Sequence, residues 1–133
     1  MPISALSGKP AARLGFAAVI GAVGVLCFAP FGFFWLAPAI WLGLFQLLRA
    51  AGSVRQAALS GLAFGLGFFL TGVSWVYVSL SQFGGMAPAA AAAATLLFCL
   101  YLALFPALAG GLFHRWRGRG TGDALLFAGL WTL

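Results

Sequence analysis

The sequence predicts an all-α integral membrane protein with four transmembrane helices and the start of a fifth. Hydrophobic residues make up 64% of its 133 residues and charged residues only 6%. In a soluble domain, roughly a quarter of the residues are charged. No charged residue lies between Arg13 and Arg49 or between Arg55 and His114. Because a helix needs about 20 apolar residues to cross about 30 Å of hydrocarbon, each uncharged stretch is too long for one crossing and suits two.

Proline and glycine divide each uncharged stretch into two spans. The segment FAPFGFF interrupts the first stretch and SQFGGMAP the second, and both residue types are typical of chain reversals. The helical spans expected from these breaks are 11–29, 33–48, 57–80 and 87–113, with an incomplete fifth over 124–133. The second span is short. Pro106 lies well inside the fourth span, where we expect it to kink the helix.

All seven basic residues fall on one side of the membrane in this segmentation. They are Lys9, Arg13, Arg49, Arg55, Arg115, Arg117 and Arg119. Because basic residues favour the cytoplasmic side, the N-terminus is expected in the cytoplasm and the two turns in the opposite compartment. The net charge of +6 is explained by basic residues that flank membrane spans. Because they form no basic helical face, the charge does not indicate binding to nucleic acid.

The cysteines and the clustered glycines favour packing over chemistry. Cys27 and Cys99 lie in separate apolar spans and are expected to be buried, without a disulfide. Gly61, Gly65 and Gly67 have small-x-x-x-small spacing, which lets helix backbones approach closely. Neither set of residues predicts a metal or cofactor site.

The end of the third span departs from the apolar background. Aromatic and polar side chains occupy two neighbouring helical faces there, if the helix continues to Leu80. The faces consist of Trp75, Ser79 and Gln82, and of Ser74, Tyr77 and Ser81. Two interpretations remain, which spacing does not separate: a belt of interfacial side chains, or the polar wall of a cavity that opens to the far side of the membrane.

Three segments resemble a known family. WVYVSLSQFGGM, with FAPFGFFWLAP upstream and LYLALFPALAGGLF downstream, is similar to the amino-terminal membrane region of the bacterial apolipoprotein N-acyltransferases. The residues that match the family motif are Trp75, Tyr77, Ser79, Phe83, Gly84, Gly85 and Met86. The resemblance implies that these residues lie at the non-cytoplasmic mouth, where they line a substrate site or support its structure.

The same resemblance implies a multi-pass enzyme of the bacterial inner membrane. Such an enzyme moves an acyl chain from a phospholipid to the α-amino group of a lipoprotein's diacylglyceryl-cysteine, through a nitrilase-like domain with a Glu-Lys-Cys triad. That domain follows the first membrane helices. Because this sequence has no glutamate, only one lysine, Lys9, and cysteines that lie within apolar spans, it cannot supply the triad. We therefore assign no catalytic residue and expect residues 1–133, the amino-terminal transmembrane region, to be inactive alone.

The final apolar segment leads to a prediction about the extent of the chain. As a helix, Ala124 to Leu133 would cover only about 15 Å, or half of the hydrocarbon layer, so we expect a truncation before the catalytic domain. Two other classes of protein stay open: a small transporter, and a non-catalytic membrane assembly subunit that packs through its glycine faces. Coupled transport usually needs an ionisable residue inside the bilayer, which this segmentation does not provide.

Overall fold

A computed structural model describes residues 10–118 and 122–132, and the regular structure in these ranges is helical. The α-helices are α1 (Pro10–Gly24), α2 (Ala37–Arg49), α3 (Val54–Gly72), α4 (Trp75–Val78), α5 (Pro88–Trp116) and α6 (Gly122–Thr132). Short 3-10 turns at Val25–Cys27 and Phe34–Leu36 border the loop between α1 and α2, and a π-helix, η4 (Ser79–Phe83), follows α4. Lys9 and Arg119 lie outside the described ranges.

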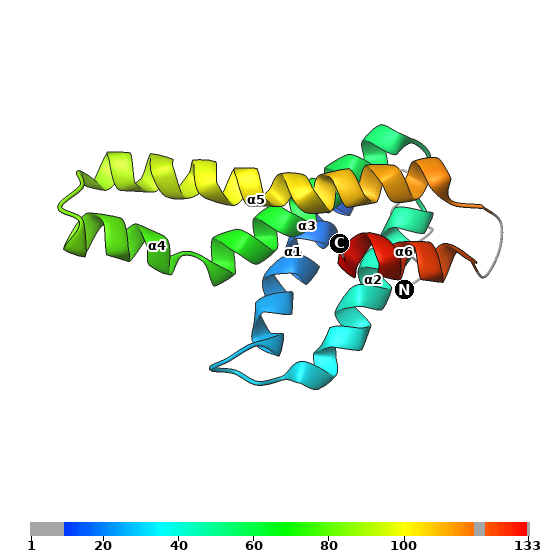
Figure 1. Cartoon of the computed structure of the whole chain (residues 1–133), viewed down its shortest axis with the longest axis horizontal. Helices are drawn as coiled ribbons and strands as arrows, with labels where there is room; N and C mark the ends of the chain where they lie inside the picture. Colours follow the sequence, from blue (N-terminus) through cyan, green and yellow to red (C-terminus); the bar gives the residue numbers. More distant parts are fainter. Residues whose placement is uncertain (1–9, 119–121, 133) are drawn as a thin grey trace.

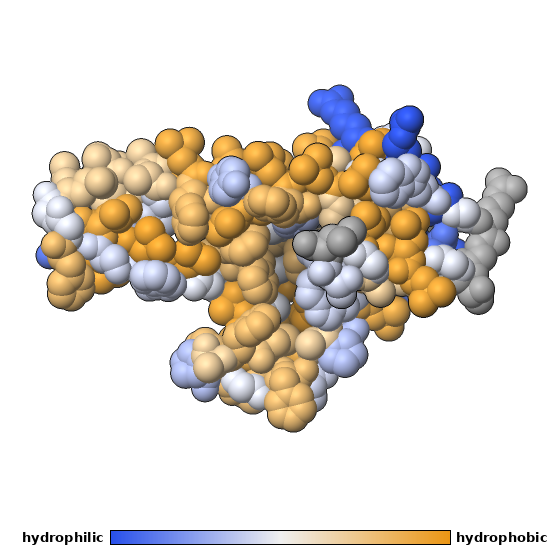
Figure 2. Space-filling view, viewed as in Figure 1, coloured by the Kyte–Doolittle hydropathy of each residue, from blue (hydrophilic) through white to orange (hydrophobic). Residues whose placement is uncertain are grey.

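Three of these helical segments are long and apolar enough to cross a membrane: Pro10–Cys27, Val54–Gly72 and Pro88–Trp116. Helix α3 packs along α5 on one side and against α1 on the other (Figure 1). The core forms where these helices meet α2, and its largest buried members are Leu44, Leu47, Leu48, Phe64 and Phe113. Strongly hydrophilic residues gather mainly at the end of the molecule where α3 begins and α5 ends (Figure 2).

Beyond this core, α4, η4 and the first half of α5 extend away from the other helices as a two-helix projection, which we call the arm (Figure 1). The tip of the arm is the turn between η4 and α5. Because α5 continues from this tip back to the hydrophilic end, one helix connects the two ends of the molecule.

Local sequence explains where several helices begin. The side-chain oxygen of Ser53 accepts a hydrogen bond from the Gln56 N–H at 3.2 Å, and Gln56 Oε1 accepts one from the Gly52 N–H at 2.9 Å. These reciprocal bonds give partners to two N–H groups that have none within the helix. One is that of Gln56 in the first turn of α3, and the other is that of Gly52, the residue before the cap. Pro38 and Pro88 lie in the first turns of α2 and α5, where the missing proline N–H removes no helical hydrogen bond.

The close helix contacts expected at the clustered glycines are confirmed. A Cβ atom at Gly61 would overlap the carbonyl oxygen of Pro106 in α5, and one at Gly65 would lie 2.6 Å from the Pro106 Cγ. A Cβ at Gly67 would overlap the carbonyl oxygen of Ala18 in α1. Helix α3 therefore brings its backbone against two neighbours, and the absence of side chains at these glycines makes room for the Pro106 ring.

The expected single helix over residues 57–80 is wrong, because the chain breaks it after Gly72. Two hydroxyl groups next to the break bond backbone carbonyls: Thr71 Oγ1 donates to Gly67 O at 2.8 Å and Ser74 Oγ to Thr71 O at 3.3 Å. Such local bonds compete with the helical pattern, and glycine is itself a weak helix former. The chain turns at Val73 and resumes as the short α4.

The other helices follow the expected order with different bounds. Helix α5 corresponds to the expected span 87–113 (Figure 1). It remains one helix through Pro106, so the proline does not end it, and the kink that we expected there stays a prediction. The expected span 33–48 is a 3-10 turn followed by α2, and the combined segment Phe34–Arg49 is shorter than the three membrane-length helices. Helix α6 occupies the region of the expected fifth span.

Candidate functional site

The residues that match the family motif follow one another along the arm, from its first helix to its tip. Trp75 and Tyr77 belong to α4, and Ser79 and Phe83 to η4. The glycine pair and the methionine, Gly84, Gly85 and Met86, form the turn that leads into α5. The structure thus places the motif on the arm, with Phe83 to Met86 at the end of the molecule opposite the hydrophilic residues (Figures 1 and 2).

Backbone hydrogen bonds define the tip of the arm. The Gly84 N–H donates to Ser79 O at 2.9 Å, which closes a wide π-type turn, and the Met86 N–H donates to Leu80 O at 3.1 Å. Gly85 has φ +63°, in the left-handed region that glycine adopts without steric cost. A Cβ at Gly84 would lie 2.8 Å from Leu80 O, so the turn also needs a small residue there. The backbone conformation of the turn therefore explains why both positions of the motif are glycine.

The side chains of the motif point largely outward. The exposed fraction is 63% for Trp75 and 86% for Phe83, while Tyr77 and Met86 are each just over one third exposed. Ser81 Oγ donates to Tyr77 O at 2.8 Å, so this hydroxyl is used within the helix. The two faces expected from α-helical spacing do not continue past Ser79, because η4 has the wider π-helical turn. Segments of π-helix are rare and occur often at functional sites.

The arm is rich in aromatic side chains and carries no charged side chain. Its ionisable side chains are the phenol of Tyr77, the Cys99 thiol and, farther along α5, the phenol of Tyr101. Within the described part of the chain, no three His, Cys, Asp or Glu residues gather where they could hold a metal ion. Cys99 is fully buried, as expected, whereas Cys27 is only partly buried, and both are free thiols. Aromatic rings with an exposed backbone turn suit contact with lipid or with another protein surface.

A polar network at the opposite end of the molecule was not predicted. Arg13 was expected to flank the first membrane span, but it is 4% exposed. Its guanidinium donates to Ser60 Oγ at 3.0 Å, to Leu47 O at 2.6 Å and to Ala50 O at 3.3 Å. The last carbonyls of a helix have no intrahelical partner and carry partial negative charge, so Arg13 satisfies the carboxyl end of α2.

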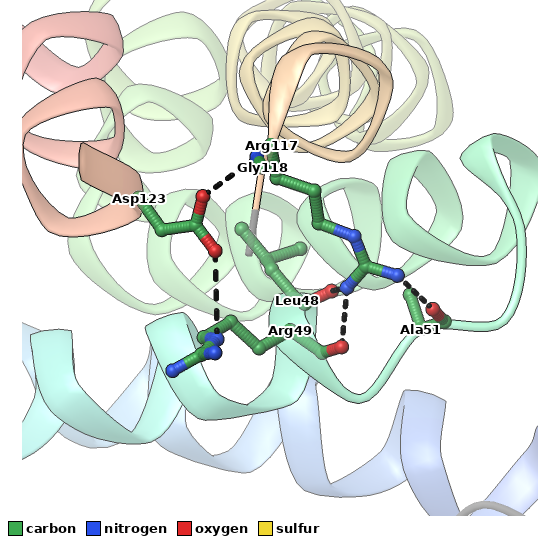
Figure 3. A network of polar contacts seen from close by, with 6 residues as sticks. All are labelled: Leu48, Arg49, Ala51, Arg117, Gly118 and Asp123. Atoms are coloured by element: carbon green, nitrogen blue, oxygen red, sulfur yellow. Dashed lines mark hydrogen bonds and ion pairs between the residues drawn. The ribbon is translucent and has the colours of Figure 1, made fainter. Parts of the chain in front are cut away.

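Arg117 approaches the same end of α2 from the end of α5 (Figure 3). It donates to Ala51 O at 3.0 Å and to Leu48 O at 3.4 Å, and it also contacts Arg49 O. Two of the arginines that were interpreted as membrane flanks thus connect α1 and α5 to α2. The sequence offered no clear sign of this role, because the acceptors of both arginines are backbone carbonyls that become available only where α2 ends.

Asp123 completes this network from α6 (Figure 3). It is 4% exposed, its Oδ1 accepts a hydrogen bond from the Gly118 N–H at 2.9 Å, and its Oδ2 lies 3.7 Å from Arg49 Nε. The acid stands in the first turn of α6, where negative charge is favourable. The network holds helices together: Arg13 and Arg117 donate mainly to backbone carbonyls at the end of α2, and Arg49 pairs with Asp123.

Comparison with known proteins identifies the family. Residues 20–133 match the model of the apolipoprotein N-acyltransferase N-terminal domain. The chain is 46% identical to the apolipoprotein N-acyltransferase of Ralstonia nicotianae over 92% of its own length, and 44% identical to that of Nitrosomonas europaea over 91%. A shorter match to the Methylococcus capsulatus enzyme covers 64% of the chain at 53% identity. The chain spans about a quarter of the length of the first two relatives, 25% and 24%. This protein therefore belongs to the apolipoprotein N-acyltransferase family, whose N-terminal membrane domain it carries.

Proposed function

We propose that this chain is the membrane part of an enzyme that transfers an acyl chain from a phospholipid to a lipoprotein. The acceptor is the α-amino group of the N-terminal diacylglyceryl-cysteine. The observation that carries this proposal is the family match over residues 20–133, and relatives named apolipoprotein N-acyltransferase support it. The protein would be a multi-pass component of the bacterial inner membrane, with four spans and the start of a fifth.

The chemistry itself is assigned to residues outside this chain. The sequence has a single acidic residue, Asp123, which is committed to Gly118 and Arg49, so it offers no free carboxylate base. Cys99 is buried in the apolar body of α5, and Cys27 borders an apolar region. Reactive thiolates need an electropositive, accessible environment, which neither cysteine has.

The chain alone is therefore expected to transfer no acyl group. The measurement uses the purified 133-residue protein in phospholipid-containing micelles, with a diacylglyceryl-cysteine peptide as acceptor and mass spectrometry of the peptide as readout. A complete family member serves as the positive control. Turnover that survives the double substitution Cys27→Ala and Cys99→Ala would contradict the assignment of chemistry to another domain.

Within the complete enzyme, we assign the arm a role in positioning acyl substrates. Trp75 and Tyr77 would then stand near the periplasmic surface, the level of a phospholipid's ester bonds and of a lipoprotein's modified cysteine. Their exposure and the glycine-dependent turn that follows them support this role. Position alone matters, because a misplacement of about 1 Å can slow a reaction roughly a hundredfold.

The test compares aromatic residues of the motif with matched aromatic residues outside it. In a complete enzyme that carries this membrane domain, Trp75→Ala, Tyr77→Ala and Ser79→Ala are expected to lower lipoprotein N-acylation per folded molecule, by about tenfold for either aromatic residue. Trp116→Ala and Tyr101→Ala remove equally large side chains that are each 58% exposed elsewhere on α5 and should leave acylation unchanged. Membrane protein level is measured in the same cells.

The alternative is that the aromatic residues only anchor the arm in the membrane interface. An anchor would tolerate Trp75→Phe and Tyr77→Phe, and alanine would lower the amount of folded protein instead of the activity of each molecule. Unchanged acylation per molecule in all three alanine variants would exclude the positioning role. It would not affect the family assignment.

A further inference from the structure

An apolar cavity of about 490 Å³ lies between α1, α2, α3, α5 and α6. Its wall includes Cys27, Ala37, Trp41, Phe64, Phe105 and Trp131. The volume falls within the range of small-molecule sites, about 300 to 1,000 Å³. The cavity is lined by the end of α1, the beginning of α2 and the later part of α3, so it lies toward the loop between α1 and α2 and away from the arginine network.

The chemistry of the wall excludes water as the main occupant. Aliphatic and aromatic side chains dominate the wall, and its polar side-chain atoms are the Cys27 thiol and the indole N–H groups of Trp41 and Trp131. A buried water needs about two to four polar partners, so these three atoms are too few for water to fill a cavity of this size. An empty space of this size would forfeit dispersion contacts along the whole wall, and protein interiors contain few voids larger than a water molecule.

The position of the cavity decides which apolar molecule is available to fill it. Phe105 and Leu108 on its rim are 58% and 64% exposed, whereas Phe64 at its inner wall is 3% exposed. The cavity thus runs from the outer surface of α5 into the core. Three of the surrounding elements are the membrane-length segments, so the medium outside the rim is the hydrocarbon of the bilayer.

We propose that this cavity holds one acyl chain of a bilayer phospholipid, inserted from the membrane past Phe105 and Leu108. The head group would remain outside, since the wall has no charged side chain to bind it. The bound chain would fill the space between α2, α6 and the three long helices and so hold these elements in register. This inference rests on the cavity and the membrane-length helices and does not require acyl transfer.

Two alanines of α2 provide a matched test. Ala37 lines the cavity, whereas Ala39, two residues along the same helix, is exposed and does not line it. Tryptophan at position 37 would occupy the cavity, and tryptophan at position 39 would extend outward. The wild-type chain and both variants, Ala37→Trp and Ala39→Trp, are extracted in mild detergent, and the lipid that each retains is measured by native mass spectrometry.

We expect the wild-type chain and Ala39→Trp to retain one phospholipid per chain and Ala37→Trp to retain at least about tenfold less, which corresponds to about 1.4 kcal/mol of binding. Added phospholipid should raise the melting temperature of the first two proteins more than that of Ala37→Trp. Equal retention in all three proteins would overturn the proposal. The proposal would also fail if none of the three proteins retained phospholipid. That result would mean that another protein segment or detergent fills the space.

A second measurement keeps the inference testable if Ala37→Trp does not fold. Delipidated wild-type chain in detergent is titrated with phospholipid that carries brominated acyl chains, which quench nearby tryptophans. Trp41 and Trp131 in the cavity wall should give a saturable component of quenching at one lipid per chain. The double variant Trp41→Phe and Trp131→Phe should lose this component while the exposed tryptophans still respond. Saturable quenching that survives in the double variant would overturn the proposal.

Discussion

Among the arginines that the structure describes, Arg13 is the one that is buried. Its guanidinium occupies a buried site where Ser60 and two carbonyls at the end of α2 accept its hydrogen bonds. Arg13→Ala is expected to lower the free energy of unfolding by about 3 kcal/mol, because it removes these charge-assisted bonds and leaves buried acceptors without partners. Thermal unfolding in detergent, followed by circular dichroism, measures the change.

Arg115 is the matched control for this prediction. It is exposed, and no hydrogen bond of its side chain is found within the described ranges. Arg115→Ala removes the same charge from the same end of the molecule and should change stability by at most about 0.5 kcal/mol. Equal effects of the two substitutions would mean that net charge, and not the contact with α2, determines the stability of this end.

The arginines also show how far single residues could be interpreted from sequence. Their clustering correctly indicated that they gather at helix ends, because charge is excluded from long apolar spans. Which of them would be buried was beyond reach, since the acceptors of Arg13 lie on α2 and α3 and the contact exists only after the helices pack. The motif residues of the arm could be named by resemblance, yet their exposure follows from the direction in which α4 leaves the core.

At the scale of the helices, glycine spacing was the most informative feature. Small residues that recur every four positions indicate a close helix contact without revealing the partner, and the structure supplies Pro106 for Gly61 and Gly65. The break after Gly72 was missed because the apolar composition continues across it. The hydroxyl groups of Thr71 and Ser74 donate hydrogen bonds that compete with the helix. A sequence of this kind offers few residues from which such bonds could be predicted.

The contact between α3 and α5 gives a prediction with an internal control. Gly61→Ala places a methyl group against the Pro106 carbonyl, and we expect the two helices to separate at a cost of about 2 kcal/mol, which exceeds the gain of about 1 kcal/mol from alanine's helix propensity. Gly15→Ala in α1 meets no atom within 4 Å and should be neutral or stabilising. Melting temperatures in detergent provide the comparison, and a gain for both variants would show that the close contact is absent.

At the scale of the whole molecule, composition predicted the class of the protein because exclusion of charge from the bilayer acts on every residue. The number of crossings is less determined, since α2 and α6 are shorter than the three membrane-length segments. Their apolar surfaces pack into the core and around the cavity, so their length is set by neighbouring helices as well as by membrane thickness. The arm also depends on contacts between neighbouring helices. Its helices pack mainly on each other and leave the motif exposed.

Membrane orientation is the property that connects the two ends of the molecule. Helix α5 has 29 residues and is about 43 Å long, which exceeds the hydrocarbon thickness of about 30 Å, so its ends should lie on opposite sides of the membrane. Because basic residues favour the cytoplasm, we expect the carboxyl end of α5 and the N-terminus there and the arm tip in the periplasm. Alkaline phosphatase inserted at Gly85 should therefore be active, and green fluorescent protein fused after Arg119 should fluoresce. The exchanged reporters, with fluorescent protein at Gly85 and phosphatase after Arg119, should both be silent. If both positions instead report the same compartment, α5 does not cross the membrane and the proposed periplasmic position of Trp75 and Tyr77 is wrong.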